Sequence, residues 1–90
     1  MTRRDLLLLT EARNLATSGR AGAIRELAGL SLREVAAGCG ASPTTVYRWE
    51  RGERQPRGRP AIRWALLLHE LDQHVTKEVT PTIPFPAPTT

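Results

Sequence analysis

Residues 30–52 read LSLREVAAGCGASPTTVYRWERG, and this stretch decides the fold. Ser31 and Glu34 have the spacing of a capping box, in which the serine hydroxyl accepts from the third helical amide and the glutamate accepts from the serine amide. Leu30 and Val35 on either side are placed to form a hydrophobic staple, which fixes the angle at which the chain starts the helix. The sequence therefore predicts a helix that begins directly after Ser31.

A second short helix is predicted after a tight turn. Gly38 and Gly40 end the first helix after two turns, and we expect a positive φ at Gly40, which glycine adopts freely. Ser42 is a good N-cap, and Pro43 takes the first helical position, where the amide that proline lacks would have no intrahelical partner. Gly52 ends the second helix.

Two short helices joined by such a turn form a helix-turn-helix, with the motif over residues 31–52 and the recognition helix over about 43–51. Ala36 faces the crossing of the two helices, where a larger side chain would push them apart, and Ala41 fills the turn. The apolar residues of the inner faces are Val35, Cys39, Val46 and Trp49. The residues facing outward, on the surface that would enter a major groove, are Pro43, Thr44, Tyr47, Arg48 and Arg51.

The flanking segments are helical in pattern, and no stretch alternates with a period of two for long enough to be a convincing strand. We expect helices over 2–17 with Thr2 as N-cap, over about 20–29, and from Pro60 to about Gln73. Their core-facing residues are expected to be Leu8, Ala12, Leu15 and Ala16 in the first helix, Ile24, Leu27 and Ala28 in the second, and Ala61, Trp64, Ala65, Leu68 and Leu71 in the last.

The end of the chain has a different composition. Prolines at 81, 84, 86 and 88 alternate with Thr and Ala, which predicts a disordered or polyproline-like tail over 76–90. Ninety residues otherwise suit one domain with one small core. We therefore expect a single all-α, five-helix domain over 1–75. Since aromatic residues make up only 4% of the chain, its core would be aliphatic, with Trp49 and Trp64.

The positive charge is concentrated beside the helix-turn-helix. The chain carries a net charge of +4, and residues 48–63 contain six arginines against two glutamates, Glu50 and Glu53. The two glutamates are too few to neutralise most of these arginines. A basic stretch beside an outward-facing helix indicates an acidic partner, for which nucleic acid is the first candidate.

The sequence lacks the residues that several classes of function need. The single cysteine, Cys39, excludes an intrachain disulfide and CxxC motifs, and it acts as a small apolar filler. His69 and His74 are five residues apart, which misses the i, i+4 geometry for joint metal ligation. No nucleophile–base set or acidic pair identifies an active site, and no segment has the roughly 18 apolar residues of a membrane span. We expect a cytoplasmic protein that is not an enzyme, with no cofactor, metal, membrane or small-molecule ligand.

Residues 30–52 resemble the helix-turn-helix of the lambda repressor/Cro-like family, also called the XRE family. The ending Trp49–Gly52, WERG, followed by a basic residue and a proline, is a frequent form of that motif. The resemblance extends over about 19–72 and does not cover the first helix or the tail. It implies a compact five-helix fold and a double-stranded DNA partner bound through the major groove.

The resemblance also implies roles for individual residues. Base reading would fall to Thr44, Tyr47 and Arg48, and Arg48 can give two parallel hydrogen bonds to guanine O6 and N7. Phosphates would be held near the start of the motif, by Arg33 or Ser31, and by the loop after the recognition helix. The residues expected at the DNA backbone are Ser31, Arg33, Ser42, Thr45, Arg51, Arg54 and Arg57, with Thr45 on a phosphate or a thymine methyl.

Three further residues gain an interpretation from the family. Arg25 and Glu50 match an ion pair of some relatives, and we expect this pair to be structural. Pro43 replaces the polar residue that many relatives carry, and because proline cannot donate a hydrogen bond, its main role would be helix initiation. Tyr47 has a second interpretation, packing under the neighbouring loop, which we favour less than a groove contact.

Leu66 and Leu67 lie outside the core-facing side of the last helix. Either the first helix packs on them, or they form a two-fold dimer that sets two recognition helices about one turn of DNA apart; we prefer the dimer.

The hypothesis for the whole chain is a sequence-specific transcriptional regulator on a palindromic operator. It would be a repressor of phage Cro or mobile-element type, because nothing indicates a polymerase-contact or ligand-sensing domain. The alternatives are a protein-interaction module, such as an antitoxin or adaptor, and a nonspecific DNA-binding protein.

Overall fold

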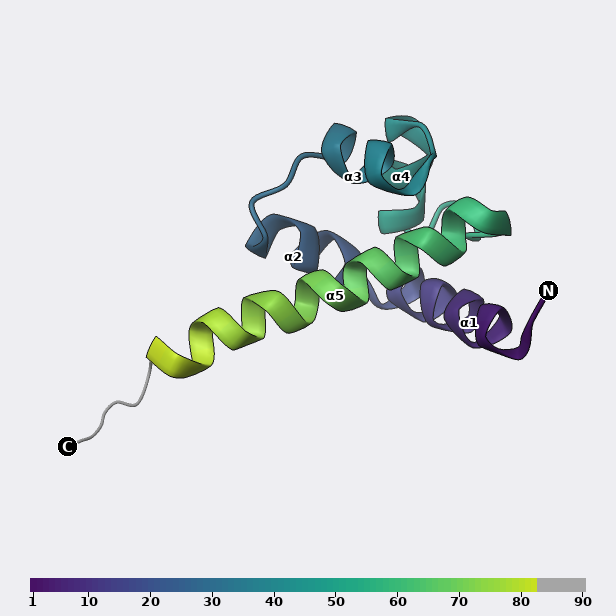
Figure 1. The fold of residues 1–90 in the computed structure, drawn as a ribbon. Helices are drawn as coiled ribbons and strands as arrows, with labels where there is room; N and C mark the ends of the chain where they lie inside the picture. Colours follow the sequence, from purple (N-terminus) through teal and green to yellow (C-terminus); the bar gives the residue numbers. More distant parts are fainter. Residues whose placement is uncertain (83–90) are drawn as a thin grey trace.

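The computed structural model describes residues 1–82, with side chains as far as Val75, and this part of the chain is all-helical (Figure 1). Its five helices are α1 Arg3–Ser18, α2 Arg20–Leu27, α3 Leu32–Cys39, α4 Pro43–Glu50 and α5 Gly58–Thr82. The long α5 contacts α1, α2 and α3, while α4 packs on α3, α1 and α2. The all-α, five-helix architecture predicted from the sequence is confirmed.

The first helix begins at the predicted cap and ends one residue later than predicted. The Asp5 amide donates to Thr2 Oγ1 at 3.0 Å, and the Thr2 amide donates to Asp5 Oδ2 at 3.2 Å, so the start is a complete capping box. Gly19 ends α1 with a φ of +77°. The buried side of α1 consists of Leu9, Ala12, Leu15 and Ala16, with Leu8 half-buried beside it.

The second helix is shorter than the sequence pattern predicted. Gly29 has a φ of +75°, and the Leu30 amide donates to Arg25 O at 3.1 Å, which closes α2 in a Schellman motif. Leu30 therefore turns back toward the core, whereas Leu27 stays 73% exposed. The prediction of Leu27 as a core residue was wrong, because Leu27 is the last residue of α2 and the covered side of that helix runs through Ile24 and Arg25 instead.

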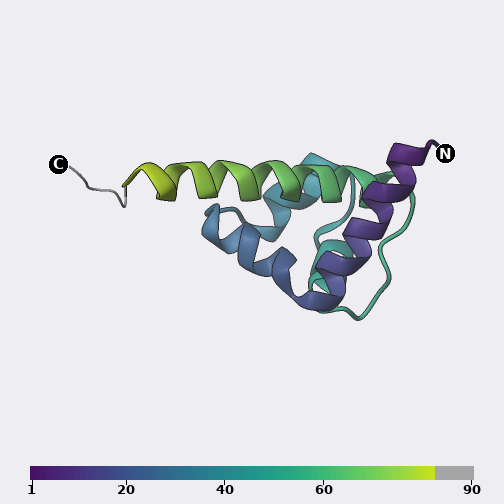
Figure 2. The ribbon, with the colours of Figure 1, turned by 90° about the horizontal axis from the view of Figure 1, so that it is seen from below.

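The fifth helix is longer than predicted at both ends. It begins at Gly58, two residues before Pro60, and continues to Thr82 instead of ending near Gln73. The prediction of a tail over 76–90 was therefore wrong for residues 76–82, which are helical. The rest of the predicted tail lies outside the described residues. Proline disfavours the helical conformation at the residue before it, but the five residues from Thr76 to Thr80 contain no proline, and Pro81 lies in the last turn of α5. Figures 1 and 2 both show this end of α5 projecting past α2.

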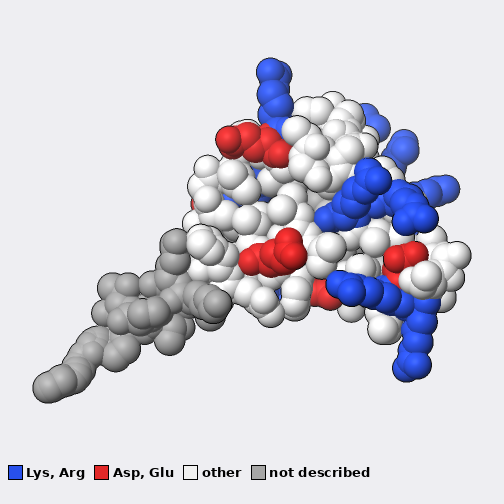
Figure 3. All heavy atoms as spheres, viewed as in Figure 1, with Lys and Arg blue, Asp and Glu red and all other residues white. Residues whose placement is uncertain are grey.

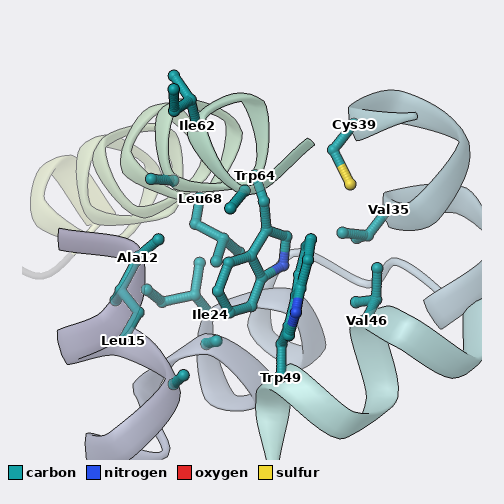
Figure 4. Close-up of a cluster of buried hydrophobic side chains, with 14 of the residues drawn as sticks. Ala12, Leu15, Ile24, Val35, Cys39, Val46, Trp49, Ile62, Trp64 and Leu68 are labelled. Carbon is teal, nitrogen blue, oxygen red and sulfur yellow. The ribbon is translucent and has the colours of Figure 1, made fainter. Parts of the chain in front are cut away.

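The core is built around two tryptophans from α4 and α5 (Figure 4). Trp64 is completely buried and Trp49 is 3% exposed, and their ring centroids are 4.9 Å apart at a tilt of 49°. The indole N–H of Trp64 has no hydrogen-bond acceptor in the described part of the chain, and it lies against the Trp49 ring. Both tryptophans are core residues, as predicted.

Leu66 and Leu67 are both half-buried. Leu67 packs on the core, and its Cδ2 lies 3.4 Å from the position that a Cβ on Gly38 would occupy. Leu67 is therefore covered by α3, and α1 also packs on α5. The large exposed hydrophobic residues near the start of the chain are Met1, at 73%, and Leu6 and Leu7 of α1, at 54% and 63%.

Candidate nucleic-acid interface

The two helices of the motif start at the predicted caps. The Glu34 amide donates to Ser31 Oγ at 3.0 Å, and the Ser31 amide donates to Glu34 Oε1 at 2.8 Å. This bond from the Ser31 amide holds the pKa of the Glu34 carboxyl below its ordinary value. In α4, Ser42 Oγ accepts from the Thr45 amide at 3.1 Å and donates to Thr45 Oγ1 at 2.9 Å. The capping bonds of Ser42 thus determine the residue at which the recognition helix begins.

The turn between the helices is tight, as the sequence indicates. Gly40 has a φ of +77°, and Ala36 is 1% exposed at the packed face of α3. A Cβ on Gly40 would lie 3.2 Å from Arg63 Nη1, so a guanidinium of α5 covers this turn. Cys39 is completely buried, and burial raises the pKa of its thiol. Glycine is needed at 40 for both its backbone conformation and the close approach of Arg63.

The recognition helix separates an apolar inner face from a polar outer face. Val46 and Trp49 are buried, whereas Thr44 and Arg48 are exposed. Tyr47 is 44% exposed, so it lies on the outer face and not under the following loop. The structure therefore brings the three predicted base-reading residues together on one solvent-facing surface of α4.

A partly buried ion pair joins α2 to the end of α4. Arg25 Nε donates to Glu50 Oε2 at 2.6 Å, and Arg25 Nη2 donates to Glu50 Oε1 at 3.2 Å. Arg25 Nη1 also donates to Leu30 O at 2.9 Å. The side chains are 15% and 9% exposed, and the hydrogen bond that Arg25 donates to Glu50 raises the pKa of Arg25. The predicted structural pair is confirmed, and it fixes the recognition helix to the rest of the domain.

Gly22 belongs to the same cluster, although the sequence analysis missed it. A Cβ at this position would lie 3.2 Å from Glu50 Oε1. A glycine inside a helix without a turn is a signal of close approach by another group. The pair therefore depends on a small residue in α2 as well as on its two charges.

Many of the basic residues lie near the recognition helix. Figure 3 shows arginines beside α4, over the following loop and the first turns of α5, and further arginines over the start of α1. Arg54 and Arg57, with Gln55, line an open cleft of about 470 Å³ beside Thr45. The apolar part of this cleft is formed by Ala41, Trp49 and Pro60. Three of the predicted backbone-contacting residues thus lie together, and Gln55 joins them as a residue that the sequence analysis missed.

Arg51 has a different environment from the other arginines of the loop. Its Nε donates to Glu53 Oε2 at 2.8 Å, and its Cζ lies 5.5 Å from the centroid of the Tyr47 ring. The hydrogen bond that Arg51 donates to Glu53 raises the pKa of Arg51. Among the six arginines of residues 48–63, only Arg51 has an ion pair within the described part of the chain. Glu53 therefore neutralises one arginine, and Glu50 pairs with Arg25.

The first helix, α1, contacts the loop between α4 and α5. Pro56 is completely buried, and its carbonyl accepts from Arg13 Nε at 3.2 Å. The two residues are 43 positions apart, so no local pattern could have indicated this contact. Through Arg13, α1 supports the loop that presents Arg54 and Arg57.

The remaining predicted residues lie at the start of α3. Ser31 and Arg33 are both exposed, and the Ser31 hydroxyl accepts the capping bond while its own proton remains available to a further acceptor. These residues form a second group, separate from the cleft between α4 and the loop.

A comparison with models of known families identifies the architecture. The model described as Helix-turn-helix matches residues 22–70, which is more than half of the chain. The chain belongs to the XRE-type helix-turn-helix family. This family consists of DNA-binding transcription regulators. Comparisons with curated proteins and with solved structures give no match to the chain. The match to the XRE-type family excludes α1, so Arg13 lies outside the matched region, whereas its partner Pro56 lies within it.

The described residues were also compared with the requirements of a metal site and of a membrane-spanning helix. Among them, no three His, Cys, Asp or Glu side chains meet in a group that could hold a metal ion. Within the same residues, no helix has both the length and the apolar character that crossing a membrane requires.

Proposed function

We propose that this XRE-type regulator is a sequence-specific repressor that places α4 in the major groove of double-stranded DNA. The observation that carries the proposal is the outer face of α4, where Thr44, Tyr47 and Arg48 are exposed together beside an excess of arginine. A short helix held by a capped start and a buried pair at its end is rigid enough to present these side chains in a fixed register.

Base reading is assigned to three side chains of α4. The Arg48 guanidinium has the donors to bind guanine O6 and N7 together, and such a contact discriminates by roughly 1–3 kcal/mol. Thr44 and Tyr47 add hydroxyl groups on the same face. Pro43 has no amide hydrogen and contributes at most an apolar contact to a thymine methyl.

Backbone contacts are assigned to two groups of residues. The group at the start of α3 is Ser31 and Arg33, and the group around the cleft is Ser42, Thr45, Arg54 and Arg57. Because phosphate contacts act at every sequence, these residues would supply affinity and position α4 without selecting a site. The Ser42 hydroxyl already donates to Thr45 Oγ1, so donation to a phosphate would replace that bond, while Ser42 Oγ would still accept the capping bond from the Thr45 amide.

The wider biological role is part of the same proposal. A homodimer with two α4 helices one DNA turn apart would recognise a palindromic operator, as expected for a cytoplasmic repressor of phage or mobile-element type. The half-buried Leu66 and Leu67 offer a smaller apolar surface to a partner than the sequence alone indicated.

The test compares three arginine variants by fluorescence anisotropy, on a site selected from random DNA and on random duplexes. Arg48→Ala should reduce the preference for the selected site about tenfold or more. Arg54→Ala should weaken both duplexes alike and reduce the salt slope by about 1. Arg20→Ala, an exposed arginine paired with Asp72 on the α2 side, is the control for loss of charge.

The proposal fails if Arg48→Ala and Arg54→Ala bind both duplexes as the unmodified protein does. Absence of DNA binding in 50 mM salt, with retained affinity for a protein, would favour the interaction-module alternative. Equal affinity for every duplex would instead indicate a nonspecific DNA-binding protein.

A further inference from the structure

Glu53 is an acidic side chain in the middle of the basic surface, and phosphate binding does not account for it. Its carboxylate lies 2.8 Å from Arg51 Nε, and both side chains are about half exposed. A phosphate approaching this guanidinium would also approach the carboxylate, and like charges repel. Arg51 is therefore poorly suited to the backbone contact expected from the sequence.

The position of Arg51 directs it toward the groove-facing side of α4. Residues 44, 47, 48 and 51 follow the i, i+3, i+4, i+7 spacing of one helix face. The Arg51 guanidinium is 5.5 Å from the Tyr47 ring centroid, one turn back along the helix. It thus lies over the exposed face of α4 and not in the cleft formed with Arg54 and Arg57.

The backbone of Glu53 is also fixed. Gly52 has a φ of +71°, and the Glu53 amide donates to Arg48 O at 2.9 Å in the Schellman motif that ends α4. The carboxylate is consequently presented at a defined point next to the last turn of the recognition helix.

The free atoms of the pair match the edge of one base pair. Glu53 uses only Nε of Arg51, which leaves the Nη1 and Nη2 hydrogens to donate. Within the described residues, Glu53 Oε1 has no hydrogen-bond partner and can accept. In the major groove, guanine presents two acceptors, N7 and O6, and its cytosine partner presents the N4 amino donor. Two donors beside one acceptor are complementary to this pattern.

We propose that Arg51 and Glu53 act together as a second base-reading element that selects a G·C pair, with Arg51 on guanine and Glu53 on the cytosine amino group. This inference rests on the proposed DNA-binding function and adds a specificity-determining residue of negative charge. Glu53 has a second effect, because neutralising Arg51 lowers the affinity for DNA of any sequence.

The experiment is selection of bound sites from random DNA with the full chain and four variants. Glu53→Ala removes both the charge and the acceptor, whereas Glu53→Gln removes the charge but keeps a side-chain oxygen that accepts from cytosine N4. Both should bind random duplexes more tightly, but only Glu53→Ala should lose the preference for G·C at one position, by roughly fivefold to tenfold. Arg51→Ala should lose preference at that same position. Glu26→Ala removes a charge from an exposed residue of α2 and should leave the motif unchanged.

The outcomes separate this inference from the function on which it rests. If the unmodified chain selects no motif, the proposal of sequence-specific binding is wrong, and the proposed base-reading pair is then wrong as well. If the unmodified chain selects a motif that Glu53→Ala and Arg51→Ala leave unchanged, only the base-reading pair is wrong. A uniform loss of affinity in Arg51→Ala, with a reduced salt slope, would make Arg51 a phosphate ligand and overturn the inference.

Discussion

Two arginine–glutamate pairs lie at the end of the recognition helix, and they differ in burial and in geometry. Arg25 and Glu50 are 15% and 9% exposed and form two hydrogen bonds, whereas Arg51 and Glu53 are 56% and 51% exposed and form one. Burial strengthens the attraction between charges and makes the loss of either partner harmful. Exposure leaves the remaining donors and acceptors available to a ligand. The same two residue types thus hold the helix in one pair and present hydrogen-bonding groups in the other.

The largest effect is expected when the buried pair loses one partner. Glu50→Ala leaves the Arg25 guanidinium partly buried with only the Leu30 carbonyl as acceptor. We expect a loss of about 3 kcal/mol in the free energy of unfolding, measured by urea denaturation with tryptophan fluorescence. The matched substitution, Glu53→Ala, serves as the control. Equal losses in the two variants would contradict the distinction between the pairs.

A smaller effect is expected from crowding the buried pair without removing a charge. In Gly22→Ala the new Cβ would be 3.2 Å from Glu50 Oε1, which Arg25 holds in place. We expect a net destabilisation of about 1 kcal/mol, even though alanine favours a helix over glycine by a similar amount. In the Glu50→Ala background the same substitution should stabilise α2, because the crowding atom is gone. A destabilisation in both backgrounds would show that Gly22 has another role.

The smallest effect on stability is expected from the exposed pair. Glu53→Gln should change the free energy of unfolding by less than about 0.5 kcal/mol, since water and salt screen an ion pair at this exposure. Urea denaturation at low and high salt measures this directly. A loss above 1 kcal/mol would mean that Glu53 stabilises the fold.

The parts of the fold that the sequence predicted well are those fixed by neighbours within a few residues. The caps at Ser31 and Ser42 and the positive φ at Gly40 involve contacts over four residues or fewer, so the local pattern is sufficient. Leu27 was misplaced because helical spacing from Ile24 does not show which neighbouring positions the rest of the domain covers, and the long-range pairing of Arg25 turns that side of α2 inward. The length of α5 was underestimated because a proline at 81 was taken as a limit for residues well before it.

The candidate site also has a part that the sequence predicted and a part that depends on contacts between distant residues. The exposed face of α4 follows from helical periodicity, and the Arg25–Glu50 pair followed from resemblance to the family. The contact of Arg13 with Pro56 and the choice of Arg51 as the partner of Glu53 depend on how the loop folds back. A run of arginines and glutamates at this density permits several pairings, and only the geometry of the loop selects one.

The proposed function requires that α4, and not α1 or α5, meets the DNA. The most direct measurement is a titration of isotope-labelled protein with a selected DNA duplex, following backbone amide shifts by NMR. We expect the largest shifts within residues 42–57, with smaller shifts at residues 31–33 and little change along α1. Shifts centred on residues 3–18, with an unperturbed α4, would contradict the proposed function.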